Sequence, residues 1–179
     1  MPFKAKLAQM SLLSRMIWRF ELVFPNYFHY MHRYIKSNNN ELPAVLTALA
    51  GCCHARTPLS ELQPIITLIL QNFANEAAPF DKLVMGVNTL KEICLRIPEA
   101  MEEDDIYQIC LLRKNKHKMV AGCIRSYINL WRAIDPRKIR KEYRGREWQE
   151  EDGQAWETDV KTHNNISGIG FLNRHRKIR

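Results

Sequence analysis

The sequence contains few glycines and no long apolar run, and both absences restrict its fold. Only seven of the 179 residues are glycine, and four of these lie at or after Gly145. The first part of the chain therefore has little of the turn chemistry that a many-stranded sheet needs, which favours long helices. No apolar stretch approaches the roughly 20 residues that span a bilayer, so no transmembrane helix is expected.

Motifs for catalysis are also scarce. There is no glycine-rich phosphate loop and no nucleophile elbow, and Gly168-Ile169-Gly170 lacks the third glycine and the preceding strand of a dinucleotide-binding motif. The acids from Glu102 to Asp105 stand at the start of a predicted helix, where capping and the helix dipole explain them. We therefore predict that the protein is not an enzyme and takes no cofactor or small-molecule substrate.

The five cysteines lie among apolar residues, and no two of them form a CxxC pair. Their odd number argues against a disulfide framework and favours a reducing compartment. Cys52 and Cys53 are followed by His54, but adjacent helical side chains point about 100° apart and the spacing fits no zinc finger. His29 and His32 have no acidic or thiol partner nearby. We expect structural cysteines and no metal site.

Apolar residues recur at intervals of three and four over nearly all of the first 140 residues, as in amphipathic helices. Helices are expected at about residues 5–23, 26–36, 42–55, 59–74, 80–97, 102–114 and 117–134, with a further short one from residue 136. Pro25 is expected to end the first helix, because its ring nitrogen cannot donate and the residue before it avoids the helical region.

The predicted helices repeat along the chain. Alternate helices begin at Ala5, Leu42, Phe80 and His117, which are 37, 38 and 37 residues apart. A shift of 37 places apolar residues of one helix on those of the next: Leu83 on Val120, Val87 on Ile124, Leu90 on Tyr127 and Cys94 on Trp131. Helix pairs that recur every ~40 residues are typical of HEAT and armadillo repeats. We predict an all-α, HEAT/armadillo-like solenoid of about four helix pairs over residues 1–146, with a plain helical bundle as the alternative.

The first predicted helix allows two interpretations. Lys4, Lys6, Arg15 and Arg19 precede the first acid, Glu21, which resembles the composition of a mitochondrial presequence. The favoured interpretation is an amphipathic helix of the solenoid. Its apolar stripe consists of Leu12, Leu13, Met16, Ile17, Phe20 and Phe24. A matrix protein would require cleavage near Phe20.

The excess positive charge is confined to one segment. Residues 111–146 carry twelve Lys or Arg against two acids, whereas the chain on each side of them is close to neutral. The candidate RNA-binding residues are Arg113, Lys114, Lys116, Lys118, Arg125, Arg132, Arg137, Lys138, Arg140, Lys141, Arg144 and Arg146. Such a segment favours a polyanion, and structured RNA is recognised largely by backbone and shape. A basic patch for acidic protein is the alternative.

Beyond residue 146 the periodicity ends. We predict that residues 147–179 form an extended arm that is ordered only on a partner. The residues of this arm expected to bind a partner are Trp148, Trp156, Ile169, Phe171, Leu172, Arg174, Arg176 and Lys177.

Several stretches of the chain resemble the family named for severe depolymerization of actin. They are Phe24–Phe28, Leu62–Pro64, Asn72-Phe73, Met85–Cys94, Arg96–Met101, Lys114–Val120, Arg125–Arg132, Ile134–Pro136, Tyr143–Arg146 and Ile166–Leu172. The resemblance covers most of residues 24–172 and is poorest over residues 37–58. Family members are usually several times longer, with a lysine-rich and acidic C-terminal half, so this chain is either a fragment or a reduced form.

The resemblance implies a nucleolar and nuclear helical scaffold in the biogenesis of the large ribosomal subunit. Its partners would be ribosomal RNA, other assembly factors and ribosomal proteins on the precursor particle, and it would support maturation and nuclear export. One copy per particle and no membrane contact are expected. The alternative is a helical-repeat adaptor in transport or actin organisation, whose groove would bind a peptide and whose basic face would bind acidic protein.

Overall fold

The computed structural model describes residues 3–36 and 41–145, and this part of the chain contains helices and no strand. The helices are α1 (Phe3–Phe20), α2 (Pro25–Lys36), α3 (Leu42–Cys52), α4 (Leu59–Asn72), α5 (Phe80–Arg96), α6 (Glu103–Leu111), α7 (Lys118–Ile134) and α8 (Lys141–Arg144). Short 3-10 turns lie at Pro98–Ala100, Leu112–Lys114 and Pro136–Lys138. Within the described ranges, every helix is too short or too polar to cross a membrane.

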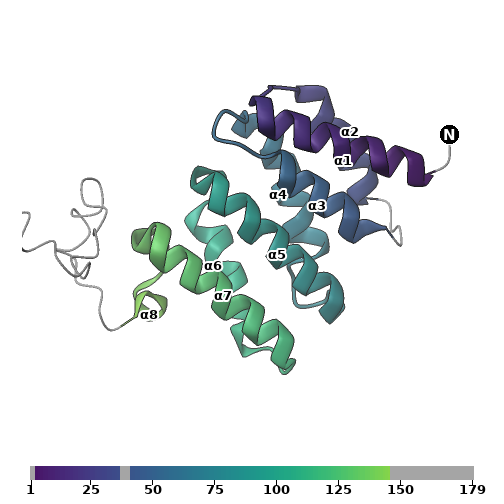
Figure 1. Ribbon diagram of the computed structural model, residues 1–179. Helices are drawn as coiled ribbons and strands as arrows, with labels where there is room; N and C mark the ends of the chain where they lie inside the picture. The colour runs from purple at the N-terminus through teal and green to yellow at the C-terminus, as the bar shows by residue number, and fades with distance from the viewer. Residues whose placement is uncertain (1–2, 37–40, 146–179) are drawn as a thin grey trace, which may run out of the picture. The chain divides into compact units, whose positions relative to one another are not determined.

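The helices form two layers. α1, α3, α5 and α7 lie side by side in that order, and α2, α4 and α6 lie behind them (Figure 1). α1 packs on α3, α3 on α5 and α5 on α7, while α2 contacts both α3 and α4. In the described part, α3 and α5 thus each have a front-layer helix on both sides, as in a repeat solenoid. The predicted all-α, HEAT-like fold is confirmed.

The core follows the periodicity that the sequence predicts. Val87 and Leu90 of α5 are fully buried, as are Ile124 and Tyr127, their counterparts on α7 at a shift of 37. The corresponding α3 residues, Leu49 and Cys52, are also buried. Because each helix buries the same positions against its neighbours, one continuous apolar core joins the repeats.

Polar contacts also join consecutive repeats. The Ser14 hydroxyl of α1 donates to the Ala48 carbonyl of α3 at 2.6 Å, inside the core. The Lys91 ammonium of α5 donates to the Ser126 hydroxyl of α7 at 2.9 Å. Ser14 also explains Gly51, because a Cβ there would stand 2.8 Å from its Oγ.

The end of α1 differs from the prediction. Pro25 does not end this helix and is instead the first residue of α2. α1 ends at Phe20, since Glu21 takes a left-handed φ of 50° and the Leu22 N–H bonds the Ile17 carbonyl at 3.0 Å. A left-handed residue with this bond is a common way to end a helix, and proline suits the first helical position because its missing donor is not needed there.

Of the apolar stripe predicted for the first helix, Ile17 lies in the core, but the stripe as a whole does not face it. The buried residues of α1 are Met10, Ser14 and Ile17, whereas Leu12, Leu13, Met16 and Phe20 are exposed, as is Phe24 after the helix. The helix is amphipathic, but most of its large apolar side chains point away from the core of the described residues.

Two helical glycines provide a matched test of the packing. A Cβ on Gly86 of α5 would stand 2.7 Å from the Phe73 Cβ, whereas a Cβ on Gly122 of α7 would meet nothing within 4 Å. Alanine favours a helix interior over glycine by about 1 kcal/mol. We therefore expect Gly122→Ala to raise the free energy of unfolding by about 1 kcal/mol. Gly86→Ala should lower it by about 1–2 kcal/mol, because overpacking outweighs that gain.

Urea denaturation followed by circular dichroism measures both changes. An equal stabilisation by the two substitutions would show that α5 does not approach the end of α4 at Gly86 as closely as described.

Candidate nucleic-acid interface

The basic segment starts where α6 ends and follows the chain through α7 to Gly145. The structure places its cations in two groups, at opposite ends of α7, with Arg125 between them. α7 has 17 residues, so its ends lie about 25 Å apart. The twelve candidate residues therefore do not form one compact cluster.

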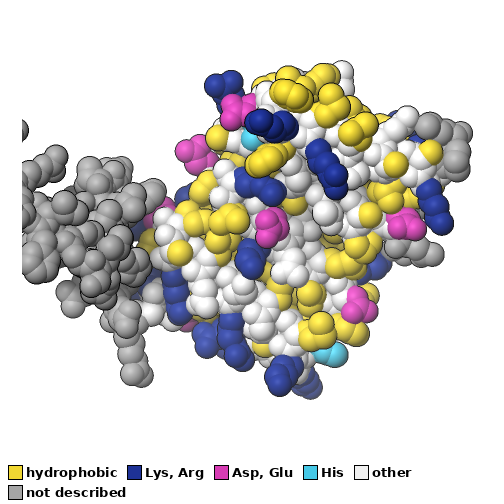
Figure 2. Space-filling view, in the orientation of Figure 1, with side chains coloured by type: hydrophobic (Ala, Val, Ile, Leu, Met, Phe, Trp, Pro, Cys, Tyr) yellow, Lys and Arg dark blue, Asp and Glu magenta, His cyan; other side chains and the backbone are white. Residues whose placement is uncertain are grey.

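The first group consists of Arg113, Lys114, Lys116 and Lys118, and all four side chains are exposed. None of them forms a salt bridge or side-chain hydrogen bond with another residue of the described part. Figure 2 shows Lys and Arg side chains at the lower edge of the molecule, where α7 begins. We refer to these four residues as the α7 entry cluster.

Local contacts fix the backbone that carries the α7 entry cluster. Leu112 is buried, and its carbonyl accepts the Asn115 N–H at 3.0 Å. The Asn115 side chain accepts the His117 N–H at 3.0 Å, and the His117 ring stacks on Phe80 with 4.4 Å between ring centroids. The turn is therefore held from both sides, and its four cations project from a defined backbone.

The start of α7 adds to the positive potential of this cluster. The N-cap residue, His117, makes no side-chain capping hydrogen bond, and the first turn of the helix has no acid. The N–H groups of a helix start carry partial positive charge and bind anions. Lys118 at this position is unfavourable for the helix by itself, but the combination suits a phosphate group.

The second group lies around the end of α7, and two of its members bind parts of the fold. The Lys138 ammonium donates to the carbonyls of Pro98, at 2.9 Å, and Met101, at 3.3 Å, and it lies 5.5 Å from the centre of the Trp131 ring. The Arg132 guanidinium donates to the Tyr143 carbonyl at 2.5 Å. Lys138 thus connects the turn after α7 to the turn before α6, and Arg132 connects α7 to α8.

Two further arginines of the second group also have internal partners. Arg140 lies over the Tyr107 ring, 3.3 Å from its centre, and Arg144 donates to the Ile139 carbonyl at 2.7 Å. Arg137 and Lys141 are exposed near them and have contacts of their own.

Acids lie beside this second group. Glu103 and Asp104 of α6 line the same shallow groove as Arg137 and Lys141, together with Glu142. These carboxylates reduce the local positive potential. The α7 entry cluster therefore offers phosphate groups the more exposed and less compensated charge.

The acids at the start of α6 also affect one another. Burial raises the pKa of Asp105, and the neighbouring carboxylates of Glu102 and Asp104 raise it further. Glu102 is the N-cap but makes no side-chain capping bond, so of the two predicted roles the dipole interaction remains.

The cysteines lie in the core or at its edge. Burial raises the pKa values of Cys94 and Cys110 to about 12, so both thiols are protonated at neutral pH. Cys123 is half-buried and its thiol donates to Asn88 Oδ1 at 3.2 Å. In the described part of the chain, no three His, Cys, Asp or Glu side chains gather to hold a metal ion.

His54, next to the adjacent cysteines, has a structural contact on each ring nitrogen. Nε2 lies 3.0 Å from the Leu22 carbonyl, and Nδ1 accepts the Arg56 N–H at 3.2 Å. The proton of the neutral ring is therefore on Nε2. This histidine ties the connection between α1 and α2 to the loop after α3.

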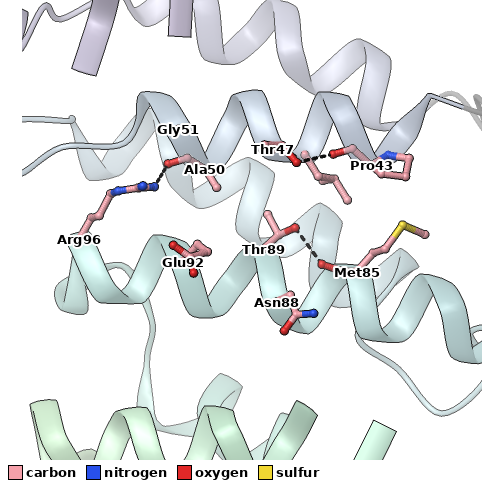
Figure 3. Close-up of a pocket in the computed structure, with 10 residues that line it drawn as sticks. Pro43, Thr47, Ala50, Gly51, Met85, Asn88, Thr89, Glu92 and Arg96 are labelled. Atoms are coloured by element: carbon pink, nitrogen blue, oxygen red, sulfur yellow. Dashed lines mark hydrogen bonds between the residues drawn. The ribbon is translucent and has the colours of Figure 1, made fainter. Parts of the chain in front are cut away.

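A groove of about 380 Å³ lies between α3 and α5 on the front layer. Figure 3 shows the side chains of Thr47, Thr89, Asn88 and Glu92 along it. The two threonine hydroxyls bond carbonyls of their own helices, those of Pro43 and Met85, both at 2.8 Å. Arg96 closes one end of the groove by donating to the Ala50 carbonyl.

Arg146 and the eight predicted partner-binding residues of the arm lie outside the described residues. The sequence did identify the α7 entry cluster, but it did not show the internal roles of Arg132, Lys138, Arg140 and Arg144. One signal for these internal roles was present in the sequence: the aromatic residues Tyr107, Trp131 and Tyr143 lie within and near the basic segment.

The sequence of the chain matches the model of a known protein family. The family model described as "SDA1, HEAT repeat" matches residues 1–116, which is more than half of the chain. The chain belongs to the SDA1 family. The resemblance to the family named for severe depolymerization of actin is therefore confirmed, and the HEAT repeat in the matching description agrees with the stacked helix pairs of the structure.

Several SDA1 proteins are similar to most of the chain. The Protein SDA1 homolog of Drosophila melanogaster is 31% identical over 145 residues, which are 81% of this chain and 20% of that protein. The Xenopus tropicalis homolog is 29% identical over 144 residues, 80% of this chain and 21% of that protein. The Caenorhabditis elegans homolog is 27% identical over 174 residues, 95% of this chain and 22% of that protein. The chain thus spans about a fifth of the length of the curated relatives it matches.

Proposed function

We propose that the chain is a non-catalytic scaffold in the assembly of the large ribosomal subunit. It binds precursor particles in the nucleolus and nucleus and supports their maturation and export. Membership of the SDA1 family supports the ribosomal role. The observation that supports the RNA contact is the α7 entry cluster, in which four exposed cations without a salt bridge in the described part stand beside the start of a long helix.

The chemistry of the cluster suits the backbone of folded RNA. Arg113 can bond a phosphate through two parallel N–H groups, and the three lysines act as mobile point charges. Each neutralised phosphate releases a counterion, which gives strong and salt-sensitive binding. The contact would be largely independent of the RNA sequence, because the cations bind phosphate groups and not base edges.

The rest of the basic segment has a different place in this proposal. Arg125 extends the contact along α7, and Arg137 and Lys141 extend it past the end of this helix. Arg132, Lys138, Arg140 and Arg144 mainly hold the end of α7 in place. Residues 1–146 act as the folded repeat domain. Arg146, the last residue of this domain, belongs to the RNA contact, and residues 147–179 act as the arm that binds neighbouring proteins or RNA on the particle.

The groove between α3 and α5 favours a second candidate function. Its exposed Glu92 and Asn88 side chains and the nearby Arg96 could bind the backbone of an extended peptide. The chain would then be a helical-repeat adaptor in transport or actin organisation. This second function does not require RNA, so ribonuclease treatment can distinguish it from the ribosomal function.

Sedimentation distinguishes the two functions. Tagged protein from its own cells is run on a sucrose gradient with and without ribonuclease treatment. The ribosomal proposal expects migration with large-subunit precursors, and loss of this migration after ribonuclease treatment. Migration as a small free protein in both gradients, or as a complex that resists ribonuclease, would contradict the RNA-bound scaffold and favour the adaptor.

A further inference from the structure

The outer side of α1 carries an apolar stripe that is partly to largely exposed in the described part of the chain. Leu12, Met16 and Phe20 are spaced by four residues and form one row along the helix, and Leu13 lies beside them. Phe20 is 65% exposed and Leu12 60%. The row lies about a third of a turn from the buried residues Met10 and Ile17. Figure 2 shows hydrophobic side chains gathered over α1 and α2 at the top of the molecule.

The position of α1 in the solenoid indicates what kind of surface this is. α3 lies between α1 and α5, and α5 lies between α3 and α7, so each has a helix on both sides. Within the described part, α1 has a front-layer neighbour only at α3. Its i, i+4, i+8 row is the kind of ridge that packs into the groove of another helix. Helices of a repeat bury such a ridge against a neighbouring helix, so a further helix is the occupant that fits this ridge.

The charges around the stripe select among possible occupants. α1 contains no acid, and Lys6 lies near one edge of the stripe while Arg15 and Arg19 lie beyond the other. Glu21, the first acid after the helix, is paired with Arg56 at 3.2 Å. A second copy of this chain would bring the cations of both helices together. A helix with an apolar face and acidic edges would complement both features.

We propose that the stripe Leu12, Leu13, Met16 and Phe20 binds an amphipathic helix with acidic flanks from a partner protein. The helix would extend the front layer on the side of α1 opposite α3. This site lies at the far end of the repeats from the α7 entry cluster, and it does not depend on the proposed RNA contact.

The test uses the full chain and a designed probe. The probe is a fluorescent helical peptide with leucines on one face and glutamates along both edges; a second peptide carries lysines in place of the glutamates. Fluorescence anisotropy at physiological salt should show saturable binding of the acidic peptide and none of the basic one. Met16→Ser with Phe20→Ser should weaken binding at least tenfold, because both side chains leave the interface.

A matched variant controls for loss of exposed apolar surface elsewhere. Leu95→Ser with Met119→Ser removes side chains that are 56% and 64% exposed on α5 and α7, and it should leave the peptide affinity unchanged. Thermal melts of both double variants should match the unchanged chain, which shows that the fold is intact.

Other occupants give different results. Co-sedimentation with vesicles of phosphatidylcholine and phosphatidylserine, without peptide binding, would replace the proposal with a lipid surface. A concentration-dependent dimer in sedimentation velocity that the Met16 and Phe20 substitutions abolish would identify a second copy. Failure to bind the acidic peptide, or equal loss in the two double variants, would also overturn the proposal.

Discussion

Trp131→Ala is expected to lower the free energy of unfolding by about 4 kcal/mol. Trp131 of α7 is the largest fully buried side chain among the described residues, and its ring lies beside Lys138, which bonds the Pro98 carbonyl in the turn before α6. Its removal leaves a large cavity and also removes the ring beside the Lys138 ammonium. Because natural domains are stable by only about 5–15 kcal/mol, this loss is a large fraction of the total stability.

Trp18→Ala is the matched control. Trp18 is on α1 and is 53% exposed, so the same chemical change should cost at most about 1 kcal/mol. Urea denaturation of the two variants gives the difference, and the midpoint of thermal unfolding should fall by about 10 °C for Trp131→Ala. Similar losses for the two substitutions would mean that α7 does not pack in the core as described.

The main features of the fold were predictable from the sequence because the same pattern of apolar residues recurs in successive helix pairs. Val87 and Ile124 occupy equivalent positions of α5 and α7, and both are fully buried. In a helical repeat, such a periodic apolar stripe indicates that the helix packs against neighbouring helices. The α5–α7 packing was therefore the most secure part of the prediction.

The errors arose where the periodicity does not say which side has a neighbour. The α1 stripe that contains Leu12 and Met16 has helical spacing, but of its members Ile17 is the one in the core. Met10 and Ser14, which are not part of the stripe, are buried with it. Ser14 was easily missed, because a polar residue reaches the core only through its bond to Ala48. Similarly, Pro25 is compatible with the end of one helix and with the start of the next.

The basic segment shows the same limit for the site. The sequence located the charge, but a count of cations does not show which ones have internal partners. Lys138 and Lys116 look equivalent in sequence, yet Lys138 bonds two carbonyls beside Trp131 and Lys116 is exposed. The two lysines differ because they lie at opposite ends of α7 and because aromatic rings pack near one of these ends. Such packing depends on the tertiary structure.

Replacement of the α7 entry cluster by glutamine is expected to weaken RNA binding on the order of 10²- to 10³-fold at 0.1 M salt. The variant is Arg113→Gln, Lys114→Gln, Lys116→Gln and Lys118→Gln. Each phosphate contact contributes roughly 0.7–0.9 to the slope of log affinity against log salt, so the magnitude of the slope should fall by about 3. Fluorescence anisotropy with a structured hairpin RNA over a series of salt concentrations measures both quantities.

A variant with the same change in net charge shows whether position matters. Lys4→Gln, Arg15→Gln, Arg19→Gln and Lys36→Gln replace four other exposed cations on α1 and α2. If the RNA contacts the α7 entry cluster, this control should keep most of the affinity and almost the same slope, since exposed charges more than about 10 Å from the RNA are screened at this salt. Equal losses in the two variants would instead show that the RNA responds to net charge alone. The four cations at the start of α7 would then have no special role, and the RNA contact would have to be sought elsewhere along α7 or outside the described residues.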